Sequence, residues 1–340
     1  MVDDAAPGRA LGALHGLAIG DALGMPTQTL PRDVVRGLFG DVAWFHDGPG
    51  VNPVSRGLPA GSVTDDTDQA LIVARALVDG GGHVSGADLA DRLLAWQAAM
   101  VAKGSADLLG PSTANALEAV GRGVPVAEAG RDGDTNGAAM RVAAVGVAVP
   151  PEPLERLVDR VVEVSRATHH TRAAIAGASA VAAAVSVGVA GARAGDQLDV
   201  AVRAAELGGR RGYDTGVPDV AERLRRAIAL VRDAGGEAAA LDAVAERVGT
   251  GVATHESVPA AFALVALCPG DPWRAVRLAA GLGGDSDTIA AMAGAIGGSR
   301  TGPEAFPRAA VALVRDVNAL DLDPLVAALL RLRAAELERL

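Results

Sequence analysis

The sequence predicts an all-α fold built as one domain. Apolar residues recur at spacings of three and four along most of the chain, whereas the period-two alternation of a half-buried strand is scarce. Gly and Pro interrupt nearly every gap between these periodic segments. No fixed-period repeat, low-complexity linker or charge block divides the 340 residues. We therefore expect a single helical domain over 1–340, with a core at about 10–302 and C-terminal helices at 303–340 packed on it.

Twelve segments carry the helical pattern, and Ser, Thr or Pro opens or precedes most of them, as is typical of helix starts. In the first half of the chain these segments are 8–23, 67–79, 85–100, 112–122, 154–167 and 172–192. In the second half they are 217–234, 259–267, 272–280, 288–298, 305–317 and 324–340. The stretch 31–45, with Trp44 and two Phe, is expected as a packed connection.

The composition limits both the core and the partners. Half of the residues are hydrophobic, yet only eight are aromatic: four Phe, three Trp and one Tyr. Ala, Gly and Val supply most of the apolar content, which predicts closely packed helices. The formal net charge of −10 leaves no basic excess to neutralise the phosphates of a nucleic acid. Stable binding to nucleic acid or to an anionic membrane is therefore not expected.

The run 173–192 contains no charged residue and is long enough on paper to cross a bilayer. Ala, Gly and Ser dominate it over Leu, Ile and Phe, which supply most of the free energy of membrane insertion. We therefore expect a buried helix of the core.

Cysteine usage and the N-terminus favour a reducing, cytoplasmic location. Cys268 is the one cysteine, has no Cys or His at zinc-site spacing around it, and is expected to be buried as a small hydrophobe. The first residues, MVDD, lack the basic region and apolar stretch that secretion requires.

Two acidic segments stand just before predicted helices. Segment 64–68 reads TDDTD, and segment 285–288 reads DSDT directly after the glycine-rich stretch GLGG. Helix N-termini favour Asp and Thr, so capping explains one such cluster taken alone. The glycines nearly spell a dinucleotide-binding fingerprint, but the third falls on Ser286 and no strand precedes it, which excludes that interpretation.

Carboxylates gathered without Lys or Arg repel one another unless a cation neutralises them. If the fold brings the two segments together, their oxygen ligands favour magnesium, manganese or calcium over zinc, because neither segment contains Cys or His. A pair of such ions could orient substrate hydroxyls and a water molecule. Residue chemistry alone leaves two interpretations open: a shared metal site and two independent helix caps.

Other stretches carry weaker signals. Segment 135–141, TNGAAMR, combines small residues with a cation and could cradle phosphate oxygens. His169 and His170 stand at a helix start, where either could bind a ligand or cap. In segment 46–61 seven of sixteen residues are Gly or Pro, which is typical of a binding loop or of a surface excursion. Segment 20–24, GDALG, is interpreted as a helix C-terminus that carries an acid.

Six motifs follow one another in a recognisable order: GDALG at 20–24, TDDT at 64–67, NGAAMR at 136–141, TH at 168–169, ESVP at 256–259 and GGDSDT at 283–288. In this order they resemble the ADP-ribosylglycohydrolase family, which includes ADP-ribosylarginine hydrolases and the dinitrogenase reductase-activating glycohydrolase. The resemblance runs from about residue 12 to residue 302. It implies an all-α domain whose central cleft holds two Mg²⁺ or Mn²⁺ ions and cleaves the bond between ADP-ribose and an acceptor.

The resemblance also implies roles for individual positions. Segment 136–141 would hold the pyrophosphate, and His169 would face the ribose or a phosphate. Tyr213, chosen because it stands in a Gly-flanked stretch poor in other aromatics, would stack on adenine. Asp65 or Asp66 would orient or deprotonate a water, with Asp66 as the expected base. The implied metal ligands are Thr64, Asp65, Asp66, Asp285, Asp287 and Thr288. The implied substrate contacts are Gln28, Asn136, Gly137, Ala138, Ala139, Met140, Arg141, His169, Tyr213, Gly284 and Ser286. Asp107 is a candidate contact to the acceptor. The alternative, a solvated acid in a loop, is the favoured interpretation.

Gln28 departs from the family pattern, because relatives commonly have a glutamate there. An amide accepts hydrogen bonds but cannot act as a base. Gln28 therefore puts in doubt hydrolysis that depends on this glutamate, such as removal of ADP-ribose from serine, but does not affect the metal ligands. Two alternatives to an ADP-ribosyl hydrolase stay open: a hydrolase of a small ribosylated metabolite or nucleoside-like glycoside, and an ADP-ribose-binding module with weakened catalysis.

Overall fold

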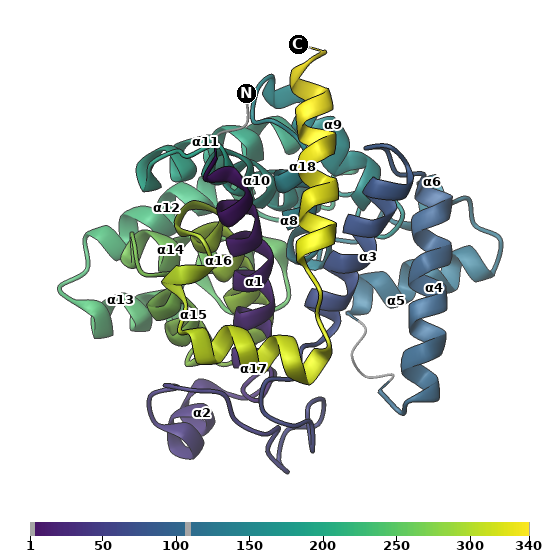
Figure 1. Ribbon diagram of the computed structural model, residues 1–340. Coiled ribbons are helices and arrows are strands. Elements are labelled where there is room, and N and C mark those ends of the chain that lie inside the picture. The colour runs from purple at the N-terminus through teal and green to yellow at the C-terminus, as the bar shows by residue number, and fades with distance from the viewer. Residues whose placement is uncertain (1–3, 106–109, 340) are drawn as a thin grey trace.

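The computed structural model describes residues 4–105 and 110–339, and these fold into helices joined by short turns (Figure 1). In chain order the α-helices are α1 Ala6–Gly24, α2 Arg32–Phe39, α3 Asp65–Asp79, α4 Gly86–Ala102, α5 Pro111–Gly121, α6 Val126–Ala129, α7 Gly137–Met140, α8 Ala143–Ala148, α9 Leu154–Ser165, α10 Arg172–Val189, α11 Ala194–Gly208, α12 Val220–Arg232, α13 Glu237–Ala243, α14 Thr254–Leu267, α15 Pro272–Ala280, α16 Ser286–Thr301, α17 Arg308–Asn318 and α18 Asp323–Leu337. A π-helix covers Val244–Val248 and a 3₁₀-helix covers Pro303–Ala305. Two isolated bridges are the whole β content of the described residues, so the all-α prediction is confirmed.

Each of the twelve predicted segments overlaps a helix, and the boundaries of α15 are those expected. The fifteen-residue helix α11 was missed, because Ala and Gly make up much of its buried face and give little hydrophobic contrast. Helix α2 lies in the stretch 31–45, which was expected as a packed connection and not assigned a helix. Helix α14 begins at Thr254 rather than at Pro259, which lies inside the helix.

Helix α10 is the uncharged run that the sequence singled out. Within the described residues it is the one helix long and apolar enough to cross a membrane, and 89% of its apolar window is buried inside the protein. The prediction of a buried core helix is confirmed. Cys268 is also buried, as expected, and burial raises the pKa of its thiol to about 12.

Helix α1 packs most extensively on α16, and the contact brings the end of α1 beside the start of α16. The approach is close enough to exclude side chains: a Cβ on Gly16 would lie 2.1 Å from the carbonyl oxygen of Gly294. A Cβ on Gly24 would lie 2.4 Å from the Cα of Asp287. The backbones themselves therefore set the spacing between the end of α1 and the start of α16.

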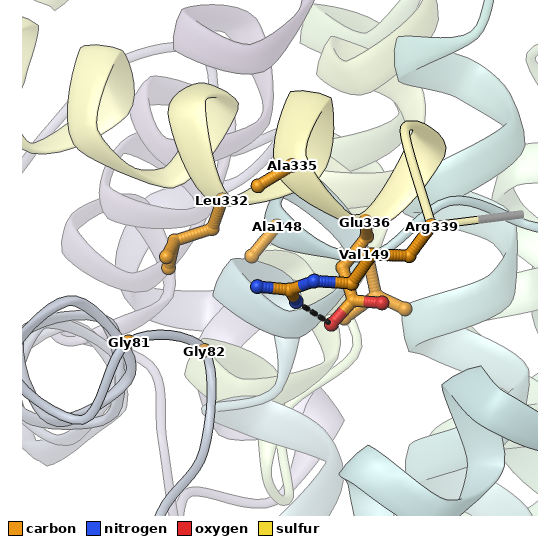
Figure 2. A pocket seen from close by; sticks show the side chains of 8 residues that line it. All are labelled: Gly81, Gly82, Ala148, Val149, Leu332, Ala335, Glu336 and Arg339. Carbon is orange, nitrogen blue, oxygen red and sulfur yellow. Dashed lines mark hydrogen bonds and ion pairs between the residues drawn. The ribbon is translucent and has the colours of Figure 1, made fainter.

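The C-terminal helices cover one side of this core. In Figure 1 α1 (purple) runs through the middle of the molecule beside α18 (yellow), and α17 lies across its lower end. A small cavity of about 40 Å³ lies between α18, α8 and the turn at Gly81 and Gly82. Its charged residues, Glu336 and Arg339, are hydrogen-bonded to each other (Figure 2), and Arg339 Nη1 lies 3.4 Å from Glu336 Oε1. This cavity contains none of the predicted site residues.

Candidate active site

The two acidic segments lie side by side at the starts of α3 and α16. The hydroxyl of Thr288 donates a hydrogen bond to Asp66 Oδ2 over 3.2 Å, across 222 positions of sequence. Thr64 is the N-cap of α3, and its hydroxyl accepts from the backbone N–H of Asp66. Asp285 is the N-cap of α16, but its side chain makes no capping hydrogen bond. Capping thus accounts for Thr64 but not for the carboxylate of Asp285, and the juxtaposition favours a shared site.

The carboxylate of Asp21 fixes the start of α3 against α1. Asp21 is completely buried in the last turn of α1. Its two oxygens accept hydrogen bonds from the backbone N–H and the hydroxyl of Thr64 and from the same two groups of Thr67. The sequence suggested only an acid at a helix end. The structure shows that Asp21 positions the first acidic segment.

Five carboxylates share this region, and no ion pair among the described residues neutralises any of them. Burial, and then repulsion by Asp287, raises the pKa of Asp66 well above its usual value. Burial followed by repulsion from Asp21 does the same to the pKa of Asp65, and burial followed by repulsion from Asp285 raises the pKa of Asp287. Burial also raises the pKa of Asp21 and that of Asp285 to about 6, against the opposing effect of their hydrogen bonds. The site has an excess of negative charge that a divalent cation would relieve.

The donor atoms fit a hard cation. Asp66 Oδ1 and Asp287 Oδ1 are buried without a hydrogen-bond partner, and the hydroxyls of Thr64 and Thr288 both donate to the other oxygen of Asp66, Oδ2. Carboxylates and hydroxyls are ligands that Mg²⁺ and Mn²⁺ prefer. In the part of the chain that the structure describes, no three His, Cys, Asp or Glu side chains are already grouped to hold an ion. The fit therefore rests on donor chemistry and on the two unpartnered oxygens.

A cavity of about 150 Å³ lies against the acidic residues. Val54, from segment 46–61, forms part of the wall, so this segment contributes to the cavity. The lining residues are Gln28, Thr29, Val54, Asp65, Gly110, Pro111, Thr113, Thr135, Asn136, Gly137, Met140, Val252, Asp285, Asp287 and Thr288. They combine a carboxylate-rich end with a wall of small apolar and hydroxyl side chains.

A second, larger cavity of about 540 Å³ lies between α2, α13 and α15. Two of its arginines are paired with acids: Arg32 with Asp242 at 2.8 Å and Arg274 with Glu237 at 2.6 Å. None of the acidic-segment residues lines it, so the smaller cavity is the candidate active site.

Gln28 lies in the cavity wall on a turn that is bonded to the start of α16. The N–H of Thr29 donates to the carbonyl of Gly284, and the N–H of Gly284 donates to that of Leu30. Asn52 Nδ2 donates to the carbonyl of Gln28 over 2.7 Å. The Nε2 of Gln28 is buried without a hydrogen-bond partner, so it is available to donate to a substrate oxygen.

The turn before α16 requires glycine at two successive positions. Gly283 and Gly284 have φ of +68° and +66°, which L side chains rarely adopt. A Cβ on Gly283 would lie 2.4 Å from the carbonyl oxygen of Leu30, and one on Gly284 would lie 2.4 Å from that of Thr250. Gly284 therefore allows the backbone conformation of this turn. It does not line the cavity, although it was expected as a substrate contact.

Asn136 connects segment 135–141 to the second acidic segment. Its Nδ2 donates to Ser257 Oγ over 2.9 Å and also to Asp285 Oδ2. Its backbone N–H donates to the carbonyl of Val252 over 2.9 Å. Asn136 thus lines the cavity and orients the carboxylate of Asp285, a role that the sequence did not reveal.

Arg141 lies elsewhere than expected. Its side chain is 0% exposed; Nη1 donates to Gln69 Oε1 over 2.8 Å, and Nη2 donates to Thr168 Oγ1. Burial lowers the pKa of Arg141 to about 10, so the guanidinium stays charged at neutral pH. The apolar run around it carries this arginine into the interior. In this arrangement it cannot contact a pyrophosphate directly, which corrects the role expected from the family resemblance.

Three further expected substrate contacts belong to the core or to helix packing. Ser286 is completely buried, and its hydroxyl lies 2.9 Å from that of Thr27, so it joins α16 to the end of α1. Ala138 and Ala139 are each 1% exposed within the hydrophobic core. Their neighbours in α7, Gly137 and Met140, do line the cavity.

Tyr213 lies outside the cavity lining. Its ring packs edge-on against His170 at 5.3 Å between centroids, and Arg131 lies over it at 5.1 Å. His169 is completely buried behind the lining residue Thr135, with 3.0 Å between His169 Nε2 and Thr135 Oγ1. The structure therefore does not bring Tyr213 to the expected adenine site, and it places His169 one residue behind the cavity surface.

Two residues whose roles sequence reasoning did not predict did carry a signal. Asp21 is the one acid in the apolar stretch 10–23, and Gln69 lies four positions after Asp65, on the same helix face. Val54 and Val252 carried none, because loops reach the cavity only once the fold is formed. Asp107, weighed as an acceptor contact, lies outside the described residues.

Comparison with known proteins agrees with this architecture. Residues 3–338 match the family described as ADP-ribosylglycohydrolase. The chain belongs to the ADP-ribosylglycohydrolase family. It is 38% identical over 325 residues to the uncharacterized protein YegU of Escherichia coli, which covers 96% of this chain and 97% of that protein. An uncharacterized protein of Archaeoglobus fulgidus is 34% identical over 287 residues, covering 84% of this chain and 85% of that protein.

A solved structure described as an ADP-ribosylglycohydrolase-related protein complex has the same fold, with a TM-score of 0.71 and 28% identity over 96% of this chain and 98% of that one. The family resemblance inferred from six ordered motifs is therefore confirmed. Since the two relatives are uncharacterized, family membership gives the class of protein and leaves the specific activity of this ADP-ribosylglycohydrolase family member to be proposed.

Proposed function

We propose that this chain is a metal-dependent hydrolase that cleaves the glycosidic bond between ADP-ribose and an acceptor, either a protein side chain or another ADP-ribosylated group. The hydrogen bond from Thr288 to Asp66 carries the proposal, because it joins the two acidic segments beside a cavity. Membership of the ADP-ribosylglycohydrolase family supports the reaction class.

Two Mg²⁺ or Mn²⁺ ions would be held by the residues that the family resemblance implies: Thr64, Asp65, Asp66, Asp285, Asp287 and Thr288. When bound, such ions orient hydroxyls and lower the pKa of a water molecule. The unpartnered oxygens of Asp66 and Asp287 support this assignment.

Asp65 and Asp66 differ in exposure, and this difference favours different roles for them. Asp65 lines the cavity, whereas Asp66 is 1% exposed. Sequence reasoning favoured Asp66 as the base; its burial favours Asp65 as the group that accepts a proton from water, with Asp66 kept as a ligand. Gln69 Nε2 donates to Asp65 Oδ2 over 2.9 Å and leaves the other oxygen for the reaction.

The rest of the cavity suits a ribosyl transition state. Glycosidic cleavage develops positive charge on the sugar ring, and the carboxylates at one end of the cavity stabilise that charge. Asn136 keeps the carboxylate of Asp285 in place, and Gln28 Nε2 can donate to a sugar hydroxyl. These interactions fix the ribose while water attacks.

A linkage-resolved assay tests the proposal. The protein, supplied with Mg²⁺, is incubated with arginine-, serine- and nucleic-acid-linked ADP-ribose, and the released ADP-ribose is measured. Release from at least one linkage is expected, with a rate about 10²- to 10⁴-fold lower in Asp65→Asn. Asp79→Asn is the matched control, because Asp79 is exposed at the other end of α3 and pairs with Arg92. No release from any linkage would refute the proposal.

One observation favours a second candidate, a hydrolase of small ribosylated metabolites or nucleoside-like glycosides. Within the described residues the cavity lining contains no Lys or Arg, and the side chain of Arg141 is buried behind it. A diphosphate would therefore meet no cationic side chain there, whereas a neutral riboside requires none.

Parallel assays separate the candidates. A higher kcat/KM for uridine or inosine than for any ADP-ribosyl linkage would establish the second. Calorimetric binding of ADP-ribose without turnover of any substrate would instead indicate a binding module with weakened catalysis.

A further inference from the structure

A chain of buried hydrogen bonds leaves the cavity at Asp65 and leads to Arg141. Asp65 Oδ2 accepts from Gln69 Nε2 over 2.9 Å, and Gln69 Oε1 accepts from Arg141 Nη1 over 2.8 Å. Gln69 and Arg141 are both 0% exposed. Solvent therefore does not replace either of their bonds.

From Arg141 the chain returns to the cavity at Thr135. Arg141 Nη2 donates to Thr168 Oγ1, which lies 2.8 Å from His169 Nδ1. His169 Nε2 lies 3.0 Å from Thr135 Oγ1, and Thr135 lines the cavity. The same guanidinium thus connects two residues that line the candidate active site, Asp65 and Thr135.

The donor character of arginine sets the direction of every bond. A guanidinium carries only donors, so Nη1 requires the carbonyl oxygen of the Gln69 amide. The NH₂ group of Gln69 is then turned to Asp65, which it holds by one oxygen. A reversed amide would put two donors face to face and leave two acceptors facing each other.

The same reasoning fixes the proton on His169. Thr168 Oγ1 already accepts from Arg141, and among the described residues its own proton has one partner within hydrogen-bonding distance, His169 Nδ1. Nδ1 therefore accepts, and the ring proton lies on Nε2, which donates to Thr135 Oγ1. The hydroxyl proton of Thr135 is then left for a group in the cavity.

The surroundings of His169 keep the ring neutral and in place. Burial, and then the charge of Arg141, holds the pKa of His169 well below its usual value. A Cβ on Gly137 would lie 2.6 Å from His169 Cε1, so the backbone of α7 lies directly against the ring. A neutral ring carries a single proton, and its position decides what Thr135 can donate.

We propose that Arg141 is a positioning residue: it fixes the Gln69 amide and the Nε2–H tautomer of His169, and so orients the Asp65 carboxylate and the Thr135 hydroxyl, two groups of residues that line the cavity. Its catalytic consequence rests on the proposed function. The orientation itself is a property of the folded chain and can be measured without a substrate.

Nitrogen NMR of histidine-labelled protein tests the orientation directly. His169→Gln identifies which of the signals from the six histidines belongs to His169. In the wild-type protein at neutral pH, Nε2 of His169 should carry the proton and Nδ1 should be unprotonated. A proton on Nδ1, or on both nitrogens, would overturn the proposal.

Variants test whether Arg141 sets this state. Arg141→Met should replace the single tautomer signature of His169 with a mixture. Thr168→Val, which interrupts the chain but keeps the guanidinium, should do the same, whereas Thr168→Ser keeps the hydroxyl and should keep the signature. If Arg141→Met does not fold, the Thr168 pair decides. An unchanged signature in Thr168→Val would contradict the proposal.

Steady-state kinetics then measure how the positioning by Arg141 affects turnover. With whichever substrate the linkage assay identifies, Arg141→Met and Thr168→Val should lower kcat by about 10- to 100-fold, the range typical of supporting residues, with a smaller change in KM. Thr168→Ser should restore most of kcat. If the wild-type protein turns over no substrate, the proposed function fails, while the NMR result still decides the role of Arg141. An unchanged kcat in a variant with an altered tautomer would refute the catalytic consequence.

Discussion

Asp21 accepts hydrogen bonds from both the backbone N–H and the hydroxyl of Thr64, a residue 43 positions further along the chain. Thr67 adds the same two donors to the second oxygen of this carboxylate. A single acid in α1 thus replaces the solvent that would otherwise cap the first turn of α3. The orientation of Asp65 and Asp66 depends on this clamp, although Asp21 does not line the cavity.

Asp21→Asn should destabilise the protein, because an amide offers one acceptor oxygen where four donors converge. Each buried donor left unpaired costs about 1–3 kcal/mol of the free energy of unfolding. Urea unfolding should be measured well above the raised pKa of Asp21, which is about 6. Thr67→Ser, which keeps the hydroxyl, is the control. Wild-type stability in Asp21→Asn would show that α3 does not need the clamp.

Gly16→Ala should lower the free energy of unfolding by about 1–3 kcal/mol, the usual cost of overpacking, because the new Cβ would lie 2.1 Å from the carbonyl oxygen of Gly294. Gly8→Ala in the same helix is the matched control, since nothing lies within 4 Å of a Cβ there. It should stabilise by up to about 1 kcal/mol through helix propensity. Equal thermal shifts in the two variants would argue against backbone contact between α1 and α16.

Metal content should approach about two ions per chain after equilibration with Mg²⁺ or Mn²⁺ and desalting, as the family resemblance implies. Asp287→Ala should reduce it, because Asp287 Oδ1 is buried and unpartnered. Asp285→Ala should also reduce it, and the exposed Asp79→Ala should not. Undiminished metal in both the Asp285 and Asp287 variants would mean that the start of α16 holds no ion.

Gln28→Glu should change linkage preference. The side-chain nitrogen of Gln28 is buried, unpartnered and in the cavity wall, so a carboxylate there would face the substrate. Release of serine-linked ADP-ribose should rise on the order of 10²-fold relative to arginine-linked release if a carboxylate acts as a base at this position. Gln28→Leu, which removes the polar end, should not produce the gain. A constant ratio of the two rates in Gln28→Glu would contradict the prediction.

Acid should destabilise the protein partly through His169. Its pKa is held well below 6.5 in the folded chain by burial and then by Arg141, so the unfolded chain binds the proton more readily. This contribution to stability is complete above pH 6.5 and is lost as the pH falls below that value. His169→Gln should therefore show a shallower loss of unfolding free energy over this range than the wild type. Parallel profiles would indicate that His169 protonates equally in both states.

The fold could be predicted from the sequence because most helices combine a regular apolar period with a clear boundary, as α15 does between Pro272 and Gly281. Helix α11 could not, since Ala201, Ala204 and Ala205 form a buried face that differs little from an Ala-rich surface. Alanine is the best helix former, but it contributes little to hydrophobic contrast.

The acidic segments could also be predicted, because Asp and Thr cluster immediately before helices of small residues. The direction of a long side chain could not. Arg141 looked like a phosphate ligand in its motif, yet the placement of α7 turns it inward to Gln69 and Thr168. Tyr213 was selected by scarcity of aromatics, and scarcity carries no information about position.

The close contact between α1 and α16 has a consequence for diversification. Asp21 and Asp287 lie on two helices whose separation is set by main-chain atoms, with Gly24 against Asp287, whereas Val54 and Val252 reach the cavity from loops. Substitutions in those loops can reshape the substrate chamber without altering the distance between the acids. Such a division separates the part of the molecule that fixes the acids from the part that shapes the cavity around them.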